Sequence, residues 1–147
     1  MENLRGKGLS FARRIYRPRI LGLGIGSLCV LAALYPLSMP GWVWALWLFN
    51  GFIWPHLAYQ LSSHSAFPYQ AERRNLLYDS VSGGFWAAAT QFTPLTAVTI
   101  LAMMTMHNVA AGGKKLMIQG MLAQLVGVAV AWLVFGPSFN PNVGLIQ

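Results

Sequence analysis

Residues 20–37 read ILGLGIGSLCVLAALYPL, a stretch that contains no charged side chain. A helix needs about 20 mainly apolar residues to cross the hydrocarbon core of a bilayer. A cluster of basic residues is typical of the cytoplasmic end of such a helix. Six basic residues precede the stretch: Arg5, Lys7, Arg13, Arg14, Arg17 and Arg19. The stretch therefore predicts a transmembrane helix whose first residue lies near the cytoplasm.

The composition of the whole chain points the same way. Of its 147 residues, 56% are hydrophobic and 9% are charged, whereas soluble domains carry about 25% charged residues. The net charge of +7 is collected in short clusters, and nucleic-acid binding needs a continuous basic surface instead. The single cysteine, Cys29, lies in the apolar stretch and excludes a disulfide within the chain.

We therefore predict an all-α fold, a polytopic bundle of transmembrane helices over residues 20–135. A polar connection over 62–74 and a glycine-containing turn over 110–115 separate some of the spans. About five spans are visible, each ending at a charge or a proline: 20–37, 42–61, 75–92, 94–109 and 116–135.

Residues 1–19 mix basic and apolar side chains, as in a helix that lies on an anionic membrane surface. We predict a basic amphipathic juxtamembrane segment here, and Pro18 allows a new helix to start after it. Four arginines are predicted to face the lipid head groups: Arg13, Arg14, Arg17 and Arg19.

The positions of lysine and arginine predict how the spans are threaded. With the N-terminus in the cytoplasm, the connections over 62–74 and 110–115 are cytoplasmic too, and all ten basic residues lie on one side. The location is then the inner membrane of a bacterium, crossed several times. Residues 136–147 become a periplasmic tail, so a sixth span would have to follow Gln147 before any cytoplasmic output domain.

Small residues at helical spacing predict close packing between spans, because small side chains let two helix backbones approach each other in lipid. Pro55 lies inside the second span and predicts a kink near Gly51, since proline lacks the backbone N–H that the helix needs. The predicted packing residues are Gly22 and Gly26 in the first span, Gly83 and Gly84 in the third, and Ala123, Gly127 and Ala131 in the fifth.

Ionisable side chains inside a span are costly in lipid and are therefore candidates for function. Counted along helices, His56 and Asp79 both lie roughly 6–8 Å below the cytoplasmic interface and could meet. A structural interpretation pairs Asp79 with an arginine or with His56. Four more polar residues lie near this level: Arg73, Arg74, Asn75 and Asn108.

Two other interpretations stay open for this polar cluster. His56 and Asp79 would bind the polar head of a lipid-like or quinone-like molecule, or His56 would hold haem together with His107. The haem interpretation is disfavoured, because intramembrane haem usually uses two facing histidines and these two lie at different depths. We predict no metal site, and no catalytic residue is apparent, since the chain shows no nucleophile–base or HExxH constellation.

Several short motifs occur in order along nearly the whole chain. They are FARRIYRPRILG at 11–22, WPHLA at 54–58, RNL at 74–76 followed by Asp79, Gly84 and Trp86, and AGG at 111–113 before two lysines. Taken together, these motifs resemble the second family of bacterial membrane-associated sensor domains.

The resemblance implies a six-span membrane domain N-terminal to a cytoplasmic nucleotide cyclase, either a diguanylate cyclase or a class III adenylate cyclase. Such a domain would anchor and regulate the catalytic domain without being an enzyme itself. It would also dimerise, because both cyclase classes build their active sites between two catalytic domains. The implied partners are the lipid bilayer, a second copy of the chain and the cyclase domain. A passive anchor or dimerisation module stays the alternative, and a small transporter is disfavoured by the lack of internal repeats.

Overall fold

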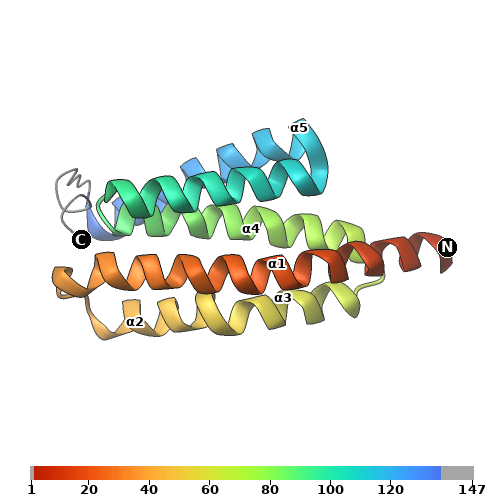
Figure 1. Cartoon of the computed structure of the whole chain (residues 1–147), viewed down its shortest axis with the longest axis horizontal. Helices are drawn as coiled ribbons and strands as arrows, with labels where there is room; N and C mark the ends of the chain where they lie inside the picture. Colours follow the sequence, from red (N-terminus) through yellow and green to blue (C-terminus); the bar gives the residue numbers. More distant parts are fainter. Residues whose placement is uncertain (1, 137–147) are drawn as a thin grey trace. The chain divides into compact units, whose positions relative to one another are not determined.

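The computed structural model describes residues 2–136, with side chains from residue 6 onward. All regular elements in this part of the chain are helices (Figure 1), which confirms the predicted all-α fold class. Residues 137–147 of the predicted tail lie outside the described residues. In chain order the helices are α1 (Glu2–Leu34), the 3-10 helix η1 (Tyr35–Leu37), α2 (Gly41–Leu48), the π-helix η2 (Phe49–Ile53), α3 (Trp54–Ser63), α4 (Pro68–Ala89) and α5 (Pro94–Phe135).

Two helical stretches are long and apolar enough to cross a bilayer. They are Gly6–Leu37, which joins α1 to η1, and Pro94–Phe135. The number of crossings and their direction stay predictions.

Helix α1 continues through Pro18 without a break, so the predicted start of a new helix at this proline is wrong. A proline inside a helix removes one backbone hydrogen bond, but side-chain packing holds the helix on both sides of it. Buried side chains recur at every fourth position along one face, which is the spacing of a packed helix stripe: Phe11, Ile15, Arg19, Leu23 and Ser27.

The helices group into two compact units. Of the described residues, the first unit comprises 2–27 and 40–76, and the second comprises 28–39 and 77–136. Helices α1 and α4 each contribute residues to both units.

In the first unit, α2, η2 and α3 run alongside α1 (Figure 1). The helices approach each other closely at Gly51, where an added Cβ would clash with the Ser27 side chain. The Trp47 indole N–H also donates to the Ser27 carbonyl oxygen at 2.9 Å. The predicted contact through Gly26 is wrong within this chain, because no heavy atom lies within 4 Å of a Cβ placed there. The contact face passes through Ser27 instead, on a different side of the helix.

The π-helix η2 lies directly before Pro55, near the position of the predicted kink. Proline has no N–H, so the Gly51 carbonyl, four residues earlier, loses its usual helical donor. A single π turn is a common way for a helix to accommodate an irregular hydrogen-bond pattern. The second apolar segment is therefore helical throughout, but it changes helix type in its middle.

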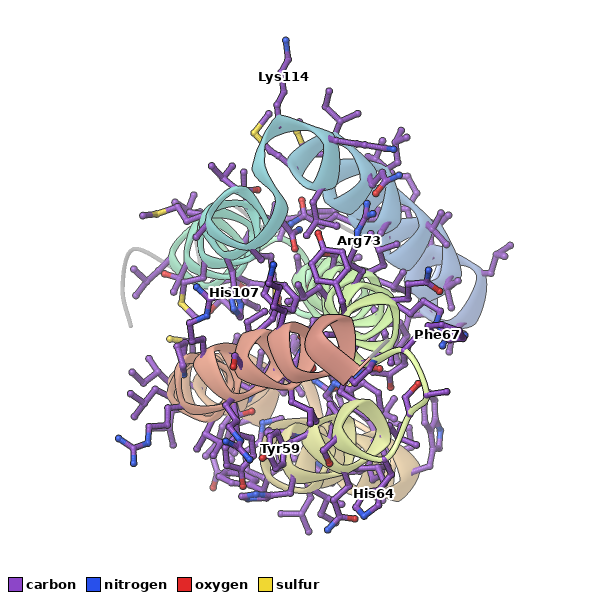
Figure 2. All side chains as sticks on the ribbon, turned by 90° about the vertical axis from the view of Figure 1, so that its right-hand side faces the viewer. Tyr59, His64, Phe67, Arg73, His107 and Lys114 are labelled. Carbon is purple, nitrogen blue, oxygen red and sulfur yellow. The ribbon has the colours of Figure 1, made fainter. Side chains whose placement is uncertain are left out.

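In the second unit, α5 reverses direction at Gly113 (Figure 1). Gly113 has φ 68° and ψ −157°, a backbone conformation that side chains with a Cβ rarely adopt. This position lies inside the glycine-containing turn predicted over 110–115. Lys114 follows it, is exposed, and points away from the ribbon in Figure 2.

Small residues bring α4 and the two halves of α5 close together in the second unit. An added Cβ on Gly83 would press on Ile100 and Met104 in the first half of α5. On Gly84 it would meet the backbone of Gln124 in the second half. An added Cβ on Gly127 would meet the Val81 carbonyl oxygen of α4 as closely as one on Gly84 would meet the Gln124 backbone. Ala131 is buried and Ala123 is half-buried.

Candidate functional site

The first unit holds a buried ion pair. Arg19 Nη1 of α1 lies 2.5 Å from Glu72 Oε1 of α4, and the two side chains are 1% and 0% exposed. Two charges removed from water are tolerated only when they are paired and hydrogen-bonded. The pair therefore fixes the position of α1 relative to the first turns of α4 within this unit.

Hydrogen bonds extend this ion pair to α3. The Ser62 hydroxyl donates to Glu72 Oε2 at 2.6 Å, so each carboxylate oxygen has a partner. Asn75 Nδ2 donates to Ser62 Oγ at 2.9 Å and to the Ala58 carbonyl oxygen at 3.0 Å. We call the side chains of Arg19, Glu72, Ser62 and Asn75 the buried polar network; all four residues are buried.

The sequence interpretation placed two members of this network wrongly. Arg19 was predicted at the membrane surface with its neighbouring arginines, but it is 2% exposed and faces Glu72. Glu72 was assigned to a polar connection, but it lies in α4, which begins at Pro68. A signal existed in both cases, because Arg19 has the apolar residues Ile15 and Leu23 four positions before and after it, and Glu72 precedes the buried Leu76 by four residues.

His56 is exposed and contacts α1 rather than lying in the buried polar network. The Tyr16 hydroxyl oxygen lies 2.6 Å from His56 Nδ1, and the two rings meet edge to face. The Tyr59 ring also packs against Tyr16, with ring centroids 4.5 Å apart. No sequence pattern indicates the Tyr16–His56 contact, which joins residues 40 positions apart.

The other polar residues predicted from the sequence divide between the two units. Arg73 is half-buried and Arg74 is exposed in the first unit, where Asn75 belongs to the buried polar network. Asp79 and Asn108 are buried in the second unit. Asn108 Nδ2 donates to Ser80 Oγ at 2.8 Å, linking α5 to α4. The predicted meeting of His56 and Asp79 joins residues of different units and stays a prediction.

The three remaining arginines of the predicted surface cluster line an open pocket of about 630 Å³ in the first unit. We call it the arginine pocket. Tyr59 reaches it from α3 (labelled in Figure 2), and all other lining residues belong to α1. The pocket is lined by Arg13, Arg14, Tyr16, Arg17, Pro18 and Tyr59.

Among the described residues, no three His, Cys, Asp or Glu side chains lie close enough together to hold a metal ion. The buried polar network and the arginine pocket, both in the first unit, differ in the chemistry that they offer. The buried polar network holds helices in place, whereas the arginine pocket offers cationic and hydroxyl donors to solvent or lipid.

Comparison with curated proteins finds relatives of greater length. The chain is 34% identical over 135 residues to a protein named "Probable diguanylate cyclase DgcC" from Escherichia coli strain K12. It has the same identity to the protein of that name from Escherichia coli O6:H1 strain CFT073. The alignments cover 92% of this chain but 36% of each relative. No solved structure matches the chain.

Residues 14–102 match the model of a known protein family, the MASE2 domain. The matched range begins in the arginine cluster of α1 and ends in the first half of α5, so it includes both the arginine pocket and the buried polar network except for Arg13. It covers more than half of the chain, and the resemblance inferred from the short motifs is thereby confirmed. The chain belongs to the MASE2 domain family.

Proposed function

We propose that this chain is the membrane-embedded sensory and regulatory domain of a bacterial nucleotide cyclase. The observation that carries the proposal is the combination of a MASE2 match with relatives that are named diguanylate cyclases and are far longer than the chain. Because those relatives bear that name, we propose a diguanylate cyclase rather than an adenylate cyclase as the output. The catalytic domain would lie in residues beyond the aligned 36%.

We further propose that the domain crosses the inner membrane several times, with its N-terminus in the cytoplasm, and works as a homodimer. The charge distribution supports this orientation, since all ten basic residues then lie on the cytoplasmic side. Many large apolar side chains of α1 and α5 are exposed in the single chain, which suits contact with lipid or with a second copy. Among them are Leu21, Ile25, Leu28, Leu125 and Leu133.

Regulation requires a stimulus that stabilises one helix arrangement over another, because a ligand shifts an equilibrium only through its different affinity for the two states. The buried polar network supports such a mechanism, since an ion pair joins α1 to α4 and hydrogen bonds join α4 to α3 in the first unit. We propose that His56, Arg73, Arg74 and Asn75 in that unit, and Asp79 and Asn108 in the second, hold the helices or bind a lipid-like or quinone-like stimulus.

Exchange of the domain in the full-length cyclase separates a sensor from a passive anchor. Residues 1–147 would be replaced by an unrelated dimeric membrane anchor, and product formation in membranes would be measured with and without added membrane extracts. We expect the natural protein to change its rate with some extracts and the exchanged protein to keep one rate. If no extract changed the rate of the natural protein relative to the exchanged protein, the domain would act as a passive anchor and not as a sensor.

Cysteine labelling tests the proposed threading. In a Cys29→Ser background, single cysteines would replace the exposed residues Ser38, Arg74 and Lys114. A membrane-impermeant maleimide should label Ser38→Cys in intact spheroplasts, and Arg74→Cys and Lys114→Cys after the membranes are inverted. The reason is that the basic connections resist transfer across the membrane. Labelling of Arg74→Cys from outside in intact spheroplasts would refute this orientation.

A further inference from the structure

We propose that the arginine pocket is a specific binding site for a phosphate group. Three guanidinium groups and two phenol rings line one concavity of about 630 Å³. A surface that only attracts anionic lipid by its charge needs exposed arginines and no more. The pocket adds concave shape and hydroxyl groups, which are features of recognition. The inference goes beyond the proposed function, because it assigns a ligand chemistry and the residues that bind it.

Among the side chains that the structure describes in the first unit, no carboxylate is left to neutralise the charge of the pocket. Arg13, Arg14 and Arg17 are all exposed. Glu72 is the acidic residue of the first unit whose side chain is described, and it is buried against Arg19. A pocket lined by several exposed cations raises the local concentration of anions.

The lining groups suit phosphate in particular. Arginine presents a planar fork of N–H donors that matches two phosphate oxygens at once. Arg13 and Arg17 are four residues apart and lie on one side of α1, so both can reach the same anion. Tyr59 lines the pocket from α3, and a tyrosine hydroxyl can act as a further donor. Tyr16 is held in place by its contacts with Tyr59 and His56.

Phosphate can reach this pocket from two sources, the head group of an anionic phospholipid or free phosphate in solution. The chemistry at the pocket is the same for both. Because the pocket is open to its surroundings, it can admit a phosphate group that remains attached to a larger molecule. The two sources are separated by the probe used in the experiment.

The test counts phospholipid molecules on the purified chain by native mass spectrometry, after titration with phosphatidylglycerol in detergent. The triple variant Arg13→Gln, Arg14→Gln, Arg17→Gln is compared with Lys7→Gln, Lys114→Gln, Lys115→Gln, which removes the same charge at exposed sites outside the pocket. We expect the arginine variant to bind phosphatidylglycerol about tenfold more weakly or worse, and the lysine variant to change by less than about threefold. Equal losses in both variants would overturn the proposal.

A second variant keeps every charge and tests the shape of the pocket. Tyr59→Leu should weaken phosphatidylglycerol binding severalfold, because it removes a lining ring and a hydroxyl donor, whereas attraction by charge alone predicts no change. Inorganic phosphate is then added in competition. Displacement of the lipid identifies free phosphate as a ligand of the pocket, and retention of the lipid identifies the head group. The experiment measures phospholipid binding and not cyclase activity. A failure of the phosphate-site proposal can therefore be distinguished from a failure of the proposed function.

Discussion

Replacement of Arg19 by methionine should destabilise the first unit by about 3–5 kcal/mol, the usual cost of leaving one member of a buried ion pair without its partner. The Glu72 carboxylate would stay fully buried and keep the Ser62 hydroxyl as a donor, but it would lose the guanidinium. The measurement is unfolding of the purified chain in mixed micelles, followed by tryptophan fluorescence and circular dichroism.

Two variants make this experiment specific to the pair. Arg17→Met removes an exposed arginine two residues away and should change stability by less than about 0.5 kcal/mol. The double variant Arg19→Met, Glu72→Met removes both charges and should recover most of the lost stability, because two apolar side chains need no pairing. If Arg19→Met and Arg17→Met had equal effects, the ion pair would not contribute to the stability of the unit.

Gly127→Ala should destabilise the second unit by about 1–3 kcal/mol, the usual cost of inserting a methyl group into a packed interior. The new Cβ would overlap the Val81 carbonyl oxygen and approach the Phe85 amide nitrogen. Both are backbone atoms of α4, so relief requires the two helices to move apart. Unfolding in mixed micelles, as for the arginine variants, measures the effect.

Gly26→Ala is the matched control for this prediction. It is a glycine inside a helix as well, so both substitutions gain the same helix propensity, up to about 1 kcal/mol. A Cβ on Gly26 meets nothing within 4 Å. The control variant should therefore be as stable as the parent chain or slightly more stable. A similar loss in both variants would contradict the packing that we assign to Gly127.

The helical class could be predicted from the sequence, because it depends on local patterns. Apolar stretches require helices in lipid, and the spacing of Gly83, Gly84, Gly127 and Ala131 marks the approach of α4 and α5. Gly113 provides the positive φ that the reversal of α5 needs.

The errors concern residues whose role depends on a partner distant in sequence. Arg19 resembles its basic neighbours until Glu72, more than fifty positions later, is placed beside it. Gly26 fits a packing motif as well as Ser27 does, and only the position of Gly51 decides which face of α1 is used. Pro18 breaks a helix in isolation, but the buried stripe that passes it outweighs one lost hydrogen bond.

The π-helix before Pro55 also sets the angular phase of the helix that follows it. A π turn closes its hydrogen bond over one residue more than an α turn, so each later side chain is rotated by about 100° from where an unbroken α-helix would place it. Ser62 points to Glu72, and Tyr59 to Tyr16, with this rotation included. Regular α geometry at unchanged chain length would turn both side chains away from their partners, whereas deletion of one residue from Phe49–Ile53 would give a regular helix in which both still face them.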